Sequence, residues 1–248
     1  MQGAVRETAI ARPFLTADWC DLVMLNFEAE PALVEPLAPA GTALDLFQGR
    51  CLVSLVGFRF VQVRLRGRRM PFHTRFDEVN LRCYVRRRVG DEVRRAVVFV
   101  RELVPLPAVA LVARWVYGER YSALPMRHEV SDHRVAYEWR LGGRWQGLAA
   151  RPFGEAALPE PGSEAEFITE HYWGCARRRR GTVEYRVSHP RWPARPARLL
   201  TLDLDAERLY GAGFAEALAR SPTSAFVLDG SAVEVGPGRV VELPWPRR

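Results

Sequence analysis

Apolar residues, many alternating with polar ones, recur along most of the chain and predict a protein built mainly from β-strands. The longest run, residues 51–66 (CLVSLVGFRFVQVRLR), is apolar on both faces in its first half and alternates in its second half. Gly57, in its middle, indicates a bend or bulge. Further strands are expected at residues 20–27, 76–86, 92–104, 121–130, 134–141, 144–148, 199–204, 225–228 and 239–243, with two more flanking a turn at 177–181.

About three helices are expected between these strands. They span residues 106–117, 163–173 and 206–220, and a short helical turn is expected near 31–37. Pro107 suits the first turn of a helix, Gly118 lies just past its end, and Ser163 is a suitable N-cap. Gly211 and Gly213 weaken the third helix. Since strands and helices do not alternate regularly, a doubly wound α/β fold is not expected.

One face of the predicted strand at residues 76–86 carries a row of polar side chains. Alternate residues of a strand point to opposite faces, so this face carries Phe76, Glu78, Asn80, Arg82 and Tyr84, and the other carries Asp77, Val79, Leu81, Cys83 and Val85. Arginine can bind a carboxylate through two hydrogen bonds, asparagine can donate and accept, and glutamate can act as a base or acceptor. Inside a barrel the row would hold a small polar ligand; on the outside it would be a solvated face with an ion pair across strands.

All 36 cationic side chains of the 248 residues are arginines. The absence of lysine excludes a Schiff base with a carbonyl substrate, a pyridoxal phosphate anchor and a P-loop lysine. A GC-rich coding bias accounts for the composition, and the chemical consequence holds whatever its origin.

The net charge of +7 is concentrated in one region. Residues 50–102 hold fourteen arginines and five acidic residues, whereas the rest of the chain holds twenty-two arginines and twenty-four acidic residues. A basic region of this kind could attract an anionic ligand, a nucleic acid or an acidic partner.

No motif indicates a metal or a cofactor. The four cysteines, Cys20, Cys51, Cys83 and Cys175, form no C-x-x-C pair and are expected to be reduced thiols in a cytoplasmic protein. The five histidines, His73, His128, His133, His171 and His189, show no ligand spacing and are expected at surface or capping positions. No nucleophile elbow and no dinucleotide fingerprint is found.

No targeting or membrane-spanning segment is predicted. The N-terminal stretch lacks the apolar region of a signal peptide, and no run approaches the ~18 apolar residues of a transmembrane helix. The arginine runs at 86–88 and 177–180 lack interleaved aromatic residues, so they favour solvated hairpin ends over nucleic-acid binding. The apolar helix at 106–117 is more typical of a core element, with a homodimer contact as the alternative.

The row from Phe76 to Val85 resembles the signature of the YqjF-like uncharacterised family, which belongs to the acetoacetate decarboxylase-like superfamily. Further pieces follow in the family's order. They are Trp19, Leu22, Asn26 and Phe27; Ala113 and Arg114; Tyr121 with Leu124, Pro125 and Met126; Phe167 to Glu170 with Tyr172; and His189, Pro190 and Trp192. The resemblance covers roughly residues 15 to 200.

The resemblance implies a single mainly β domain over residues 1–248, with a large sheet closed into a barrel or cone around a cavity. It places Glu78, Asn80 and Arg82 toward that cavity, and Arg114 either reaches the cavity or braces Glu78. Acetoacetate decarboxylase itself works through a lysine Schiff base, and the comparable stretch here, residues 117–121 (YGERY), offers no amine. The resemblance therefore implies the scaffold without that mechanism, because arginine is a poor nucleophile.

Two functions follow as hypotheses. The first is a cytoplasmic protein, catalytic or not, whose β cavity binds a small organic acid through Arg82, oriented by Glu78 and Asn80, with Tyr84, Arg114 and Tyr121 as further candidates. The second is a non-catalytic module whose basic region, residues 50–102, binds an acidic macromolecule.

Overall fold

Strands dominate the structure, a computed structural model that describes residues 10–178 and 181–241. The strands are β1 (Leu15–Glu28), β2 (Ala43–Leu44), β3 (Leu52–Leu65), β4 (Arg68–Arg69), β5 (Phe76–Val89), β6 (Glu92–Val104), β7 (Tyr121–Ala123), β8 (Met126–Ser131), β9 (Arg134–Leu141), β10 (Arg144–Pro152), β11 (Trp173–Arg178), β12 (Gly181–Ser188), β13 (Arg195–Asp203), β14 (Ser224–Val235) and β15 (Arg239–Val241). The helices are α1 (Pro31–Val34), the 3-10 helix η1 (Glu35–Leu37), α2 (Pro107–Val116), α3 (Glu164–Thr169), α4 (Ala206–Tyr210) and α5 (Ala212–Leu218). The prediction of a mainly β protein with inserted helices is confirmed.

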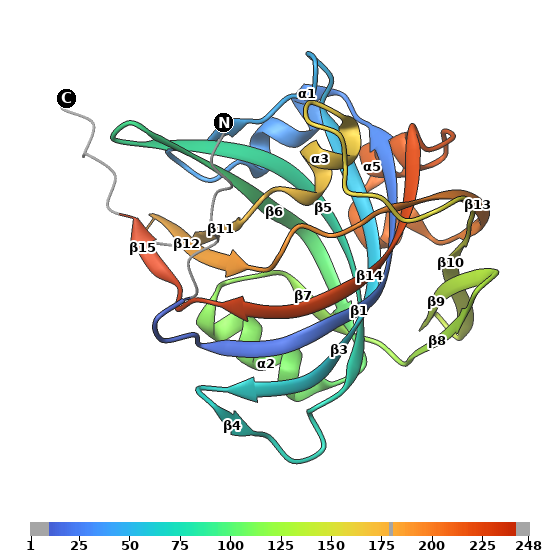
Figure 1. The fold of residues 1–248 in the computed structure, drawn as a ribbon, viewed down its shortest axis with the longest axis horizontal. Helices are drawn as coiled ribbons and strands as arrows, with labels where there is room; N and C mark the ends of the chain where they lie inside the picture. The colour runs from blue at the N-terminus through green and yellow to red at the C-terminus, as the bar shows by residue number, and fades with distance from the viewer. Residues whose placement is uncertain (1–9, 179–180, 242–248) are drawn as a thin grey trace.

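Seven strands form a closed ring. Their order is β12-β11-β6-β5-β3-β1-β14, and β12 pairs again with β14 (Figure 1). The closing contact is short, joining Val187 to Val235 and Ser188 to Glu234. Neighbours in the ring are antiparallel except β6 and β11, which run parallel at Trp173 and Gly174. The closed sheet implied by the resemblance is thus present.

A second group of strands extends the sheet beyond the ring. β14 continues through β13 and β10 to β9 and β8. The outward face of the ring packs against this extension and against α4 and α5, in a core that includes Leu25, Leu81, Tyr137 and Phe214. The inward face of the ring forms a separate core.

The two cores divide the side chains of β5. Val79, Leu81, Cys83 and Val85 belong to the outer core, whereas Phe76 and Tyr84 belong to the inner one. Glu78, Asn80 and Arg82 therefore point to the inside of the ring, since they share a face with Phe76 and Tyr84.

Several expected elements differ in the structure, and the strands expected at 20–27 and 225–228 run longer, as β1 and β14. The helix expected at 206–220 is split into α4 and α5 by Gly211, whose φ of 96° is not helical. The helix expected at 163–173 ends at Thr169, and the strand expected at 121–130 is divided into β7 and β8. The interpretation of the 106–117 helix as a core element is wrong, because Ala110 is the one buried residue of α2 and Trp115 is 80% exposed.

Arg177 and Arg178, the described part of the 177–180 arginine run, donate hydrogen bonds to backbone carbonyl oxygens of other segments. Arg177 donates to the carbonyl oxygens of Pro36 and Ala38, and Arg178 donates to that of Val116 at 2.6 Å, at the C-terminal end of α2. The remaining two arginines of the run, and residues 242–243 of the last expected strand, lie outside the described residues. Among the described helices, none has the length and apolar character needed to cross a membrane.

Candidate functional site

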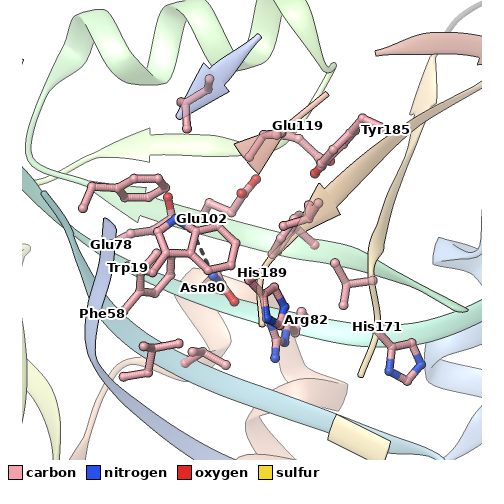
Figure 2. Close-up of a pocket in the computed structure, with 18 of the residues that line it drawn as sticks. Trp19, Phe58, Glu78, Asn80, Arg82, Glu102, Glu119, His171, Tyr185 and His189 are labelled. Carbon is pink, nitrogen blue, oxygen red and sulfur yellow. Dashed lines mark hydrogen bonds between the residues drawn. The ribbon is translucent and has the colours of Figure 1, made fainter. Parts of the chain in front are cut away.

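A pocket of about 100 Å³ lies inside the ring (Figure 2). Apolar side chains make up much of its wall, among them Trp19, Val56, Phe58 and Ile168. Its polar lining includes Glu78, Asn80, Arg82, Glu102, Tyr117, Glu119, Tyr121, Thr169, His171, Tyr185 and His189. A largely apolar pocket with a few convergent polar groups is the usual form of a small-molecule site.

Three neighbouring strands supply a polar row across the pocket. Asn80 of β5 pairs in register with Glu102 of β6, which in turn pairs with Tyr121 of β7. Glu78 precedes Asn80 by two residues on the same face of β5. Glu78, Asn80 and Glu102 are each at most 2% exposed, so the row is removed from bulk water.

Glu78 is the best-connected carboxyl group of the pocket. Asn80 Nδ2 donates to its Oε1 at 3.0 Å, and the Tyr121 hydroxyl donates to its Oε2 at 3.1 Å. Burial raises the pKa of Glu78 to about 7, although these two hydrogen bonds and the charge of Arg82 act in the opposite direction. Glu78 can therefore give or take a proton near neutral pH.

Two further buried glutamates accompany Glu78. Burial raises the pKa of Glu102 well above its ordinary value, and the nearby Glu119 and Glu78 raise it further. Burial also raises the pKa of Glu119 to about 8. Neighbouring carboxyl groups in a dry site cannot all ionise, so the cluster holds protons at neutral pH and can donate hydrogen bonds as well as accept them.

Two glycines bring Glu119 to the pocket. Gly118 has a φ of 80° at the end of α2, a conformation that turns the chain so that Glu119 follows directly into the site. Glu119 Oε1 accepts a hydrogen bond of 2.9 Å from the Tyr185 hydroxyl. The Tyr185 ring lies where a Cβ on Gly174 would come within 2.2 Å of it, so Gly174 leaves the space that this ring occupies.

Arg82 brings a cation to the pocket, and among the described residues it pairs with no carboxylate. Its Nη2 donates to the carbonyl oxygen of Ile168 at 3.4 Å, and its guanidinium lies 5.8 Å from the ring centre of Tyr84. Its Nε is buried and has no hydrogen-bond partner. In Figure 2, Arg82 and His171 lie on the opposite side of the pocket from Glu102 and Glu119.

Burial keeps the two histidines of the lining neutral. It lowers the pKa of both His171 and His189 to about 4. His171 Nε2 lies 3.1 Å from Asp45 Oδ2, and the His189 ring stacks on Trp192 at 3.7 Å between centres. The surface or capping positions expected for these two histidines are wrong, because they are only 6% and 5% exposed.

Unsatisfied polar atoms concentrate at this pocket. Eight buried side-chain nitrogen or oxygen atoms lack a hydrogen-bond partner among the described residues. Five of the eight belong to lining residues, namely Trp19 Nε1, Asn80 Oδ1, Arg82 Nε, Glu102 Oε2 and His171 Nδ1. Buried polar atoms are nearly always paired, so five such atoms around one cavity mark a place for polar ligand atoms.

The residues predicted from sequence divide into two groups. Glu78, Asn80, Arg82 and Tyr121 line the pocket. Tyr84 lies outside its lining, with its hydroxyl 2.5 Å from that of Ser54. Arg114 donates through its Nε to the backbone carbonyl oxygen of Tyr121 at 2.8 Å. Tyr121 in turn bonds to Glu78, so Arg114 is linked to Glu78 through Tyr121.

Sequence reasoning missed Glu102, Glu119 and Tyr185. Glu102 lies beyond an irregularity in the β5–β6 pairing, which shifts between Leu81 and Arg82, so simple alternation along β6 does not place it. Glu119 lies in residues 117–121, the stretch that offers no amine for a Schiff base. The sequence signal for Glu119 was an acidic side chain in that stretch. No local pattern connects Tyr185 with a site on β5.

Metal-binding residues and reactive thiols are not features of this site. Within the described part of the chain, no group of three or more histidines, cysteines or acidic residues is arranged to hold a metal ion. The four cysteines are free. Burial raises the pKa of Cys83 and Cys175 to about 12, which suppresses thiolate formation.

Residues 16–232 match a protein family, DUF2071, described as "Uncharacterized conserved protein (COG2071)". Comparison with curated protein sequences gave no match. Among solved structures, the chain is similar to an acetoacetate decarboxylase-like enzyme from Sphingomonas wittichii RW1 (TM-score 0.65, 14% identity, covering 97% of this chain and 99% of the other). It is also similar to the enduracididine biosynthesis enzyme MppR (0.64, 13%, 95% and 93%) and to acetoacetate decarboxylase from Legionella pneumophila (0.63, 12%, 98% and 96%). These structural similarities show a shared fold.

Proposed function

The chain belongs to the uncharacterised DUF2071 family and has the acetoacetate decarboxylase-like fold, and on that premise we propose that it binds a small organic acid inside its ring of strands. In this proposal Arg82 holds the carboxylate, and Asn80 and Glu78 hydrogen-bond to the rest of the molecule. The observation that carries it is the group of buried, unpartnered polar atoms around the pocket, Arg82 Nε among them.

The charge balance of the pocket supports a carboxylate as the ligand. Burial raises the pKa of all three glutamates, to about 7 for Glu78 and about 8 for Glu119, and lowers the pKa of the two histidines to about 4. Arg82 is then the permanent cation of the described lining, and it forms no ion pair with a described carboxylate. Arg82 is partly buried, and a carboxylate would supply an anionic partner with the matching bidentate geometry.

The pocket also has the parts for acid–base chemistry. Glu78 exchanges protons near neutral pH and lies beside the Tyr121 hydroxyl, so a bound acid with an oxo or hydroxy group next to its carboxylate would meet a donor and an acceptor together. Schiff-base chemistry has no place in the proposal, because the chain contains no lysine. The proposal extends to a single domain acting in the cytoplasm, for which the free cysteines are the support.

Calorimetry with pyruvate tests the proposal. MppR is described in complex with pyruvate, and this oxo acid matches the chemistry proposed here. Pyruvamide, which is neutral and of similar shape, is the ligand control. Pyruvate should bind and raise the melting temperature, whereas pyruvamide should bind at least tenfold more weakly.

Arginine variants on one strand complete the test. Arg82→Gln should weaken pyruvate binding at least tenfold, whereas Arg86→Gln, at an exposed position of β5, should keep it within twofold. Equal binding of pyruvate and pyruvamide, or unchanged binding in Arg82→Gln, would contradict the proposal.

Binding of an acidic macromolecule by the basic region, residues 50–102, is the alternative function. Of the fourteen arginines in residues 50–102, five form ion pairs with described carboxylates, namely Arg50, Arg59, Arg87, Arg94 and Arg95. This internal pairing reduces the charge left for an acidic macromolecule, so we favour the pocket. A homodimer contact stays a prediction, and nucleic-acid binding stays the less favoured form of the alternative; salt-dependent binding to DNA or RNA would support it.

A further inference from the structure

A second pocket adjoins the first and differs from it in chemistry. It has a volume of about 160 Å³ and lies between α2 and the strands β3 and β5. Its wall includes Val63 of β3, Phe76 of β5, and Val109 and Ala113 of α2. Apolar side chains dominate this lining, and it is called the α2 pocket below.

The two pockets share one wall. Leu15, Phe60, Glu78, Tyr117 and Tyr121 line both of them. The two spaces therefore adjoin at these side chains, and Glu78 with its partner Tyr121 stands at the junction. A ligand atom at this junction would contact both the acid–base pair and the apolar space.

The inward face of β5 links the two pockets in order. Phe76 lines the α2 pocket, Glu78 lines both pockets, and Asn80 and Arg82 line the polar pocket. Successive residues on one face of a strand lie about 7 Å apart, so this face grades from apolar to cationic over a length that one small molecule can span. This order, from apolar to cationic, matches the order of groups in an organic acid with an apolar tail.

The α2 pocket reaches the surface. Val112 and Met70, which belong to its lining, are 38% and 42% exposed. Phe72, in the same loop as Met70, is 94% exposed. Exposed apolar side chains in its lining suit contact with a hydrocarbon chain.

We propose that the ligand is an amphipathic organic acid, whose carboxylate binds Arg82 and whose apolar tail occupies the α2 pocket. This inference rests on the proposed function, and it adds the substrate class: acids with a linear or aromatic apolar chain rather than the smallest acids. Glu78 and Tyr121 then face the carbons between the carboxylate and the tail.

A series of straight-chain 2-oxo acids tests this inference by calorimetry. Each methylene buried in an apolar pocket contributes about 0.8 kcal/mol, or a factor of about four in affinity. From pyruvate to 2-oxooctanoate, affinity should therefore rise by about threefold to fourfold per methylene until the pocket is full. If pyruvate binds and the longer acids bind no more tightly, the inference fails and the proposed function stands. If no acid of any length binds, both fail.

Variants of α2 locate the tail. Val109→Trp and, as a second version with a smaller change, Ala113→Leu place bulk in the pocket, so 2-oxooctanoate should bind these variants no more tightly than pyruvate does. Leu111→Trp is the matched control, because Leu111 is 68% exposed and outside the pocket lining, and it should keep the gain with chain length. Retention of that gain in both pocket variants would overturn the inference.

Arg82→Gln shows whether both pockets hold the same molecule. It should weaken 2-oxooctanoate binding by at least tenfold, as expected for pyruvate. Unchanged binding of the long acid in this variant would mean that the α2 pocket holds a hydrocarbon on its own, which would also overturn the inference.

Discussion

The Tyr121 hydroxyl donates a hydrogen bond of 3.1 Å to Glu78 Oε2, and so joins the short strand β7 to the central strand of the pocket. The bond favours the ionised form of Glu78 against the effect of burial. Tyr121 thereby tunes the proton affinity of the group that we place next to the ligand.

Tyr121→Phe should raise the pKa of Glu78 above its value of about 7. Loss of one hydrogen bond to a charged group corresponds to about one pH unit. The measurement is an NMR titration of ¹³C-labelled glutamate carboxyls. Tyr210→Phe is the control, since its buried hydroxyl has no partner among the described residues. An unchanged pKa of Glu78 in Tyr121→Phe would show that the hydrogen bond does not act as stated.

Glu119→Gln should change how stability depends on pH. The pKa of Glu119 is raised to about 8 by burial, so the folded chain keeps a proton that the unfolded chain loses above pH ~4.5. Its stabilising contribution is complete below that pH and is lost as the pH rises toward 8. Glutamine mimics the protonated form at every pH.

The free energy of unfolding of Glu119→Gln, relative to the native chain, should therefore rise by about 1.4 kcal/mol per pH unit between pH ~5 and ~8. Urea denaturation at several pH values measures this difference. The same comparison for Glu155→Gln, at an exposed position, should give no such slope. Parallel stability curves for the native chain and Glu119→Gln would contradict the buried, protonated state of Glu119.

Gly174→Ala should destabilise the fold by about 2 kcal/mol or more, because overpacking a core costs energy of this order. The added methyl group would meet the Tyr185 ring at 2.2 Å. Gly236→Ala is the control, since its nearest neighbouring atom lies 3.5 Å away. Adding Tyr185→Leu to Gly174→Ala should recover part of the loss in urea denaturation, and no recovery would refute the steric explanation.

Tyr84→Phe should reduce stability while leaving pyruvate affinity within twofold. The Tyr84 hydroxyl is part of a buried chain: Ser54 Oγ lies 2.5 Å from it, Ser54 also donates to Asn26 at 2.6 Å, and Asn26 Nδ2 donates to Ser224 Oγ at 2.8 Å. Removing one buried hydrogen bond costs about 1–2 kcal/mol. Chemical denaturation and calorimetry on the same variant measure both effects. Unchanged stability with weakened binding would instead assign Tyr84 to the ligand site, as the sequence pattern predicts.

The residues of the site on β5 can be predicted from the sequence more readily than those that other strands supply, such as Glu102 of β6. Along β5 the alternation is regular, so the common face of Glu78, Asn80 and Arg82 can be read directly. Along β6 the irregular pairing changes which residues face inward, from Val97 and Phe99 to Glu102 and Val104, and nothing local marks the change. A shift of one residue moves a side chain to the other face.

Packing between segments distant in sequence accounts for the other differences between the predictions and the structure. The positions of His171 and His189 depend on rings from distant segments, as with His189 on Trp192 and His171 against Tyr84. The apolar composition of α2 indicates a buried helix, whereas Leu111 and Trp115 face outward. Only the complete structure shows that the apolar residues on its other side line a pocket.

The short pairing of β12 with β14 closes the ring, so the site forms only when strands from nearly the whole length of the chain are in place. Leu15 and Val235 both line the polar pocket, and among the described residues the ring closes through a short pairing at Val235 and Glu234. During synthesis the binding site therefore does not exist until β14 has left the ribosome, and contacts this distant in sequence form late and slowly. A ligand that binds only the closed ring would hold this narrow seam together, so nascent or truncated chains would remain the ones most open to proteolysis.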